Sequence, residues 1–405
     1  QAQRHLKEIQ EVTESEFQAY TDRRKQDILN YHLEHTPYYQ KLCGTYTKQW
    51  EEIPVLTKQD LQQPLGQRLS MDFKLKDVYV NKTSGSGGHP FTFAKDKYCH
   101  ALTWANIIAR FSNHGLTFGT SKQARFYGIP LEKVGYYKER LKDKLANRYR
   151  FPIFNLDDKT LQQYLEKFKV TSFDYINGYT SSLVLFAKYL KSQNCLLTTV
   201  CPTLKCCMAT SEMLFESDRI LMQQWFGVPI INEYGASELD LIAFEDTQGK
   251  WRINTETLYV EILDEHDKPV PHGMQGRIVI TSLYNKAHPF IRYDIGDLGI
   301  IDKASTPKTM LLKTLVGRTN DVAKLPSGKT VPGLTFYYVT KGIVEDEGFV
   351  KEFVVTQVKL DTFQIDYIAE GALTESKEIA IKNAMSTYLE PNLNLILNRR
   401  KVLKR

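Results

Sequence analysis

The chain has 405 residues, of which 42% are hydrophobic, 12% aromatic and 25% charged, as in folded globular proteins. This composition excludes a disordered, collagen-like or coiled-coil chain, and the length favours more than one domain. The net charge of +6, from 53 basic and 47 acidic residues, argues against a nucleic-acid-binding protein.

The cysteines and the hydropathy indicate a cellular setting. Six cysteines are scattered along the chain, and no stretch approaches the ~18 apolar residues that a membrane-spanning helix needs. We therefore expect reduced thiols, a cytoplasmic protein and no membrane contact. The cysteines between 201 and 207 lack the paired spacing of zinc sites, so we expect them to be buried in a strand.

Helical patterns dominate the first third of the chain. Residues 14–35 are predicted to form a helix that ends before a proline, which disfavours helical geometry in the residue ahead of it. Thr57 to Asp60 resemble a capping box that opens a second helix. A third helix is expected over 95–114, with Gly115 as its stop.

From residue 124 onward, short apolar runs alternate with helices, which is typical of a parallel sheet with crossover helices. The expected strands are 124–129, 173–176, 203–209 and 228–232, and the expected helices are 159–168, 181–190 and 213–226. After Gly235 only strands are expected, at 251–254, 258–263, 277–282 and 298–302. The pattern predicts an α/β fold whose large N-terminal domain has mixed α/β sheets and a β-rich subdomain.

A small C-terminal α+β domain is expected from about residue 322. It would hold strands at 353–358 and 362–368 and a helix over 375–389. One apolar stripe at helical spacing should bury that helix against the strands. Its members are Ile381, Ala384, Met385, Tyr388 and Leu389.

The most informative segment combines glycines with hydroxyl side chains. It reads Thr83, Ser84, Gly85, Ser86, Gly87 and Gly88. Glycines let successive backbone N–H groups turn toward one anion, and the hydroxyls can donate to the remaining phosphate oxygens. The segment lacks the order of a Walker A loop and of a dinucleotide-binding turn, and a flexible linker is the alternative interpretation.

Three later segments could complete a nucleotide site. Tyr234 offers a flat face for a purine, Ser237 a hydroxyl donor and Glu238 a carboxylate of the kind that Mg²⁺ accepts. Asp297 can accept hydrogen bonds from both hydroxyls of a ribose, and Arg318 can pair with a phosphate or the ribose. Taken alone, each of these is equally consistent with a solvated turn or a surface charge.

In their order and spacing, the four segments together resemble the adenylate-forming superfamily of acyl-CoA synthetases, peptide-synthetase adenylation domains and luciferases. The chain is most similar to the phenylacetate–CoA ligase branch, which includes CapK-type capsular-polysaccharide proteins. The segments that point to this branch are His35 to Tyr39, Ile53 to Thr57, Asn177 to Ser182 and Ala209 to Glu212. The resemblance extends from about residue 25 to 330.

The resemblance implies a role for each motif. The 83–88 loop would hold the β- and γ-phosphates of ATP, Tyr234 would stack on adenine, and Asp297 with Arg318 would hold the ribose. Ser237 would contact the α-phosphate and Glu238 would ligate Mg²⁺. The further residues expected at the site are Ser211, Glu212, Glu233 and Gly235 for the nucleotide and Tyr127, Tyr136, Tyr179 and Ala236 for the acyl pocket.

The resemblance also implies two domains and a moving part. An AMP-binding domain of residues 1–317 would be joined by a hinge at 318–321, with Asn320 at the pivot, to a mobile domain of residues 322–405. The family's C-terminal Gly-Lys loop has no match in this chain. We therefore expect that the natural chain continues past residue 405, or that another cation such as Lys82 serves in adenylation. Some relatives carry a zinc cluster after the segment of Glu238; its ligands are missing here, so we expect no structural zinc.

These features predict a ligase dependent on ATP and Mg²⁺ that adenylates a small carboxylic acid and passes the acyl group to CoA. The tyrosines of the acyl pocket favour an aromatic acid. One alternative is transfer to an amine or a sugar in polysaccharide or natural-product synthesis. Another is a catalytically impaired nucleotide-binding protein. A homodimer is one option for the assembly.

Overall fold

The computed structural model describes residues 1–44, 49–82, 92–128, 133–153, 156–318, 322–328, 330–332, 336, 339, 350–369 and 371–401. Its α-helices are α1 (Ala2–Glu11), α2 (Glu14–His35), α3 (Pro37–Cys43), α4 (Leu65–Arg68), α5 (Lys97–Ser112), α6 (Lys133–Leu145), α7 (Asp158–Lys169), α8 (Thr180–Ser192), α9 (Leu197–Val200), α10 (Glu216–Phe226) and α12 (Glu375–Tyr388). Short 3-10 turns lie at Trp50–Glu52, Asp60–Gln62 and Leu75–Asp77.

The strands form several sheets. They are β1 (Tyr79–Lys82), β2 (Thr92–Lys95), β3 (Gln123–Phe126), β4 (Arg148–Phe151), β5 (Tyr175–Tyr179), β6 (Cys206–Thr210), β7 (Ile230–Ala236), β8 (Asp240–Glu245), β9 (Trp251–Ile253), β10 (Leu258–Leu263), β11 (Gln275–Ser282), β12 (Tyr293–Ile301), β13 (Leu312–Arg318), β14 (Val322–Lys324), β15 (Thr330–Pro332), β16 (Val350–Lys359), β17 (Thr362–Ala369) and β18 (Asn394–Arg399).

The largest sheet has the strand order β4-β3-β5-β6-β7-β8-β9. Strands β4 to β7 run parallel, whereas β8 and β9 are antiparallel additions to the edge. The parallel part arises because a helix follows most of these strands, and a crossover helix returns the chain to the same end of the sheet. The carboxyl ends of β3, β5, β6 and β7 therefore meet at one edge.

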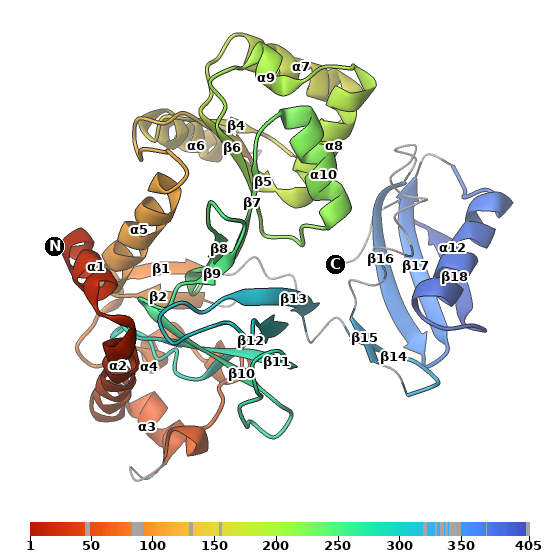
Figure 1. The fold of residues 1–405 in the computed structure, drawn as a ribbon. Helices are drawn as coiled ribbons and strands as arrows, with labels where there is room; N and C mark the ends of the chain where they lie inside the picture. The colour runs from red at the N-terminus through yellow and green to blue at the C-terminus, as the bar shows by residue number, and fades with distance from the viewer. Residues whose placement is uncertain are drawn as a thin grey trace.

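Each face of this sheet is covered by helices (Figure 1). On one face, α7, α8, α9 and α10 bury a core that includes Phe126, Phe151 and Phe168. Burial of each such ring contributes about 1.5–3 kcal/mol. On the other face, Phe111 of α5 packs with Met208 and Phe244. Alternate side chains of one strand therefore reach two different cores.

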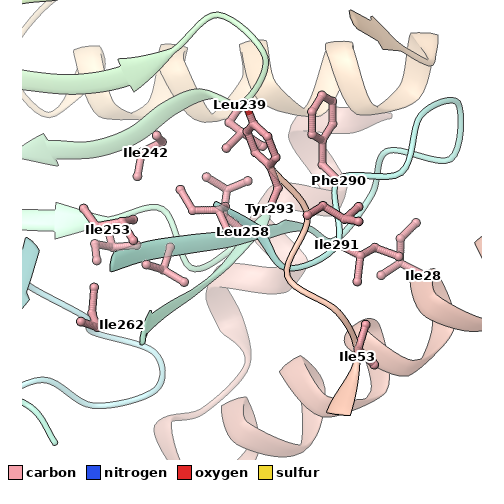
Figure 2. Close-up of a cluster of buried hydrophobic side chains, with 14 of the residues drawn as sticks. Ile28, Ile53, Leu239, Ile242, Ile253, Leu258, Ile262, Phe290, Ile291 and Tyr293 are labelled. Carbon is pink, nitrogen blue, oxygen red and sulfur yellow. The ribbon is translucent and has the colours of Figure 1, made fainter. Parts of the chain in front are cut away.

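A second sheet, of order β10-β11-β12-β13, is antiparallel. Its inner face shares a core with the β7–β8 hairpin and with α2 and α3. Figure 2 shows side chains of this core, with Leu239 beside Tyr293 and Leu258 close by. The two sheets are thus joined around the β7–β8 turn, and this junction positions the candidate site.

The C-terminal part has a hydrophobic core of its own. Strands β16 and β17 pair antiparallel, β18 lies parallel to β17, and α12 packs against them. In Figure 1 these elements form a separate group, coloured blue. The expected small α+β domain is therefore present, with β18 as an element that was not expected.

Two expected helices are shorter than predicted. At Thr57 the capping interaction exists, since the carboxylate of Asp60 accepts from the Thr57 backbone N–H at 2.8 Å, but only a 3-10 turn follows before Pro64. The helix expected from residue 95 begins at Lys97, because Lys95 belongs to β2 and Asp96 caps the helix. In the first case Pro64 prevents the helix from continuing. In the second, Lys95 pairs with Tyr79 of β1 and so cannot start the helix.

Two further expectations are corrected. Tyr388 is 46% exposed, although its predicted partners in the stripe, Ile381 and Met385, are each 2% exposed. Strand β7 extends to Ala236, so Tyr234 lies within a strand and not in the loop after it. The six cysteines are free; Cys206 and Cys207 are buried in β6 as predicted, whereas Cys201 is buried but lies outside the strand.

Candidate functional site

The β7–β8 hairpin carries the central motif. A register shift separates Tyr234 from Gly235, and a turn at residues 237–239 leads into β8. A Cβ at Gly235 would lie 2.5 Å from the backbone oxygen of Asp240, closer than real Cβ contacts. Glycine is therefore needed for the close approach of the two strands, which brings the exposed Ser237 to the tip of the turn.

Tyr234 and Asp297, from different sheets, are brought together. The Tyr234 phenol donates a hydrogen bond of 2.6 Å to Oδ2 of Asp297, and the two residues are 7% and 8% exposed. Asp297 is the cross-strand partner of Arg318, whose side chain lies outside the described residues. The predicted adenine and ribose contacts are thus neighbours. In this structure, however, the ring of Tyr234 is mostly covered by the protein.

Glu238 is held by Tyr293, the first residue of β12. Glu238 is 5% exposed, and its Oε1 accepts a hydrogen bond of 2.9 Å from the phenol of Tyr293. Burial and the negative charge of Glu238 raise the pKa of Tyr293, so this phenol remains a neutral donor. The bond fixes one oxygen of the carboxylate at the junction of the two sheets.

Lys95 is a site residue that the sequence reasoning missed. Its ammonium forms an ion pair with Asp240, the first residue of β8, and donates to the backbone oxygen of Ser237 at 3.4 Å. The Lys95 side chain is 3% exposed. The four residues of β2, Thr-Phe-Ala-Lys, do not alternate between apolar and polar side chains, so the sequence carries no signal for the strand and places Lys95 in the next helix. Lys95 thus fixes the turn between Tyr234 and Asp240.

The glycine-rich residues 83–88 lie outside the described residues, and so does the side chain of Lys82. The two ends of the connection that contains them are described: β1 and β2 pair antiparallel, with Lys82 opposite Thr92. The buried guanidinium of Arg68 donates to the Thr92 carbonyl at 2.7 Å, and Phe93 lies in the same core as Tyr234. The ends of the glycine-rich connection are therefore anchored beside the β7–β8 turn.

Several predicted acyl-pocket and nucleotide residues meet at the carboxyl edge of the large sheet. The ring centroids of Tyr127 and Tyr179 lie 4.7 Å apart, and Ser211, which follows β6, is exposed. Next to them, the Thr210 hydroxyl donates to Glu233 at 2.8 Å. Burial raises the pKa of Glu233. Four adjacent strand ends supply these side chains, as the parallel arrangement requires.

Other predicted residues have structural partners elsewhere. The Glu212 carboxylate accepts from the Ser181 backbone N–H at 2.6 Å and from its hydroxyl at 3.0 Å, and so caps the first turn of α8. Tyr136 makes its hydrogen bond to Arg140 of its own helix, at 3.1 Å. Ala236 is half-buried against the junction core. The predicted pivot, Asn320, lies outside the described residues.

Glu238 is a carboxylate at the β7–β8 turn whose chemistry suits a hard cation. No group of three or more histidine, cysteine, aspartate or glutamate side chains among them could form a metal cluster. Mg²⁺ usually binds through one or two carboxylates together with substrate phosphates and water, so Glu238 alone is chemically sufficient on the protein side. In the part of the chain that the structure describes, no helix is long and apolar enough to cross a membrane.

The chain has relatives among characterised proteins. It is 24% identical over 280 residues to the protein CapK of Staphylococcus aureus, which is 67% of this chain and 59% of CapK, so it spans less than two thirds of that relative. The solved structure of 2-hydroxyisobutyryl-CoA ligase in the postadenylation state, with R3-HIB-AMP, has a TM-score of 0.68 at 17% identity and covers 94% of this chain and 86% of that chain. Amide bond synthetase McbA from Marinactinospora thermotolerans has a TM-score of 0.55 at 16% identity, covering 82% of this chain and 67% of that chain. No protein-family model matches the chain.

Proposed function

We propose that the chain is a member of the adenylate-forming superfamily and a ligase that activates a small carboxylic acid with ATP, because its fold is similar to that of 2-hydroxyisobutyryl-CoA ligase and CapK is a sequence relative. The acid's carboxylate attacks the α-phosphorus of ATP, an acyl-adenylate forms, and pyrophosphate leaves. CoA then attacks the activated carbonyl through its thiol, giving the thioester and AMP. The fold's relatives include a CoA ligase that has been solved with an acyl-adenylate, which supports this order.

One observation carries the proposal. The Tyr234–Asp297 hydrogen bond, the Tyr293–Glu238 hydrogen bond and the Lys95–Asp240 ion pair all lie around one turn, beside the ends of the glycine-rich connection. These contacts join three separate segments of the chain, around Lys95, Tyr234 to Asp240 and Tyr293 to Asp297. Independent surface turns would have no reason to converge in this way, whereas a site for a nucleotide triphosphate requires it.

We assign the residues by their chemistry. Asp297 accepts from the ribose hydroxyls, Ser237 donates to the α-phosphate at the tip of the turn, and residues 83–88 receive the outer phosphates. Glu238 would hold Mg²⁺, which offsets the negative charge of the phosphates. Tyr293 and Lys95 orient Glu238 and its turn. Because the acid and ATP are both anionic, orientation and charge compensation are what the protein must supply.

The two-part fold supports a change of arrangement between the half-reactions. We propose that residues 322–405 rotate about 318–321, with Asn320 at the pivot, so that the adenylate is first shielded from water and then opened to the acceptor. The cation that assists adenylation would come from Lys82. CoA is the proposed acceptor. The amine acceptor is a second candidate, because one structural neighbour is an amide bond synthetase.

Acid-dependent ATP–pyrophosphate exchange tests the proposal. We expect exchange above background with at least one member of a panel of small acids, and a loss of about 100-fold or more in Glu238→Gln with unchanged folding. Glu265→Gln, at a side chain that is 86% exposed, is the matched control. Mass spectrometry of the products with CoA and with amines then decides the acceptor. Thermal protection by ATP without exchange under any condition would favour the alternative of a nucleotide-binding protein.

A further inference from the structure

Helix α6 turns its apolar side chains outward. Tyr137, Leu141 and Leu145 follow one another at intervals of four residues, so they form a stripe along one face of the helix. They are 69%, 59% and 80% exposed, and Leu145 is the most exposed large hydrophobic side chain among the described residues. A surface helix of a globular protein normally buries its apolar stripe. In α6 this arrangement is reversed.

The opposite face of α6 is polar and holds the helix against the large sheet. Glu139 and Asp143 each form an ion pair of 2.9 Å with Arg150 of the edge strand β4. Asp143 also pairs with Arg148 at 2.5 Å, and the Arg140 guanidinium donates to the backbone oxygen of Arg150 at 2.8 Å. No described side chain of α6 belongs to a hydrophobic core. The helix is therefore attached beside β4 by charged contacts, which leaves its apolar stripe free (Figure 1).

The charge that α6 exposes is positive. Both of its acids are engaged by the arginines of β4, whereas Lys138, Lys142 and Lys144 are exposed. At 3.6 residues per turn, Lys144 lies on one side of the apolar stripe and the other two lysines on the opposite side. Lys142 also pairs with Glu139 at 2.7 Å, but its side chain remains 54% exposed.

This part of the chain carries most of the protein's net charge. Residues 133–150 include seven basic and two acidic residues, which gives the segment a net charge of +5. The total for the chain is +6, so the remainder has a net charge of only +1. Positive charge is thus concentrated on the segment that also exposes the apolar stripe.

An exposed apolar stripe flanked by lysines fits an anionic lipid surface. In helices that lie in a membrane interface, the apolar side chains enter the boundary between headgroups and acyl chains, and the lysines attract anionic lipids. The ring of Tyr137, with its polar hydroxyl, is favoured at this depth. A nucleic acid would contact the lysines but leave both leucines in water. A second copy docked on the same face would bring the lysines of two chains together, which is unfavourable.

We propose that α6 docks the protein on a membrane surface that contains anionic lipids. The apolar stripe enters the headgroup region, and the three lysines bind the phosphates of the headgroups. With 13 residues, α6 lies on the surface and is too short to span a bilayer. The hydropathy of the sequence, which led us to expect no membrane contact, does not reveal this face, because three apolar residues spaced among lysines form no apolar run. The inference does not depend on the proposed adenylation reaction.

Co-sedimentation of the full chain with vesicles tests the inference. The probes are vesicles of phosphatidylcholine alone and vesicles in which about 30% of the lipid is phosphatidylglycerol. We expect the partition coefficient to be at least about 10-fold higher for the anionic vesicles, and to fall as salt rises from about 0.1 to about 0.5 M. The double variant Leu141→Gln/Leu145→Gln should lower it about 10-fold or more, because the inserted side chains are lost. Lys138→Glu/Lys144→Glu should lower it about 30-fold or more, because attraction becomes repulsion.

Two matched controls change exposed residues elsewhere. Ile220→Gln/Ile379→Gln replaces isoleucines that are 55% and 51% exposed on α10 and α12. Lys250→Glu/Lys382→Glu makes the same change in net charge at two exposed lysines outside α6. Both controls should bind the anionic vesicles as the unmodified protein does. All four double variants alter exposed side chains, so each should keep the circular dichroism spectrum and unfolding midpoint of the unmodified protein.

Three results would overturn the inference. The first is no binding, or equal binding to neutral and anionic vesicles. The second is a loss of binding in the controls as large as that in the α6 variants, since the effect would then reflect overall charge or hydrophobicity. The third is a dimer, seen by sedimentation velocity without lipid, that the leucine variant dissociates. That result would assign the stripe to a second copy of the chain.

Discussion

Removal of the Tyr234 hydroxyl breaks the hydrogen bond that joins β7 of the large sheet to β12 of the antiparallel sheet. In Tyr234→Phe the ring keeps its packing near Trp251, 6.1 Å between centroids, but the 2.6 Å hydrogen bond to Asp297 is lost. A hydrogen bond to a charged acceptor contributes about 1.5–3 kcal/mol, and both residues are more than nine-tenths buried, so little water can replace it. We therefore expect the free energy of unfolding to fall by about 1.5–3 kcal/mol.

The same substitution should affect ATP more than the chemical step. Asp297 would lose the group that orients it, and a ribose contact is similar in the ground and transition states, so KM for ATP should rise while kcat stays constant. Urea unfolding and pyrophosphate exchange at varied ATP measure the two effects. Tyr137→Phe, at a ring that is 69% exposed, is the control and should change neither.

A double-mutant cycle with Asp297→Asn identifies the interaction itself. The coupling energy between the two positions should be about 1.5–3 kcal/mol. Effects on unfolding that add within about 0.5 kcal/mol, or an unchanged KM for ATP in Tyr234→Phe, would refute the reasoning that joins these residues in one site.

Three further substitutions test other contacts of the described residues. Lys95→Met leaves the Asp240 carboxylate, which is 26% exposed, without its cation. Urea unfolding should show that the free energy of unfolding falls by about 3 kcal/mol. A decrease of less than about 1 kcal/mol would contradict the assigned pairing. Gly235→Ala forces a methyl group to within 2.5 Å of a backbone oxygen and should lower exchange activity strongly, whereas Gly66→Ala, in open space, should not. Burial lowers the pKa of His32 from 6.5 to about 4. Between these two pH values His32 is protonated in the unfolded chain but not in the folded chain. The free energy of unfolding should therefore decrease as the pH falls from 6.5 to 4, by up to about 1.4 kcal/mol per pH unit. An equal pH slope in His32→Gln would count against this explanation.

Sequence reasoning predicted the periodic elements well. The helix at Glu14–His35 and the strand at Leu258–Leu263 have the predicted bounds, because their apolar spacing and their end signals agree. The α/β class, the β-rich part and the small C-terminal domain are likewise confirmed. Apolar residues that repeat every 3.6 positions indicate a helix and those that repeat every 2 positions indicate a strand, so these elements can be predicted without knowledge of tertiary contacts.

What the sequence did not predict depends on pairing between distant segments. β8 follows β7 through a turn without proline or asparagine, and its run of buried side chains has no alternation to mark it. Lys95 is recognisable as a site residue only when β2 is placed beside Asp240, which is 145 residues further along the chain. Tertiary contacts of this kind override local propensity.

The most direct test of the central claim follows the oxygen atoms of the acid. An acid that supports exchange is labelled with ¹⁸O in the carboxylate and incubated with ATP and CoA. If the carboxylate attacks the α-phosphorus and the acceptor then attacks the carbonyl, one labelled oxygen must remain on AMP, and mass spectrometry should find it there. Label in orthophosphate together with ADP, or AMP without label, would contradict an adenylate intermediate and with it the proposed role of the site around Tyr234, Glu238 and Asp297.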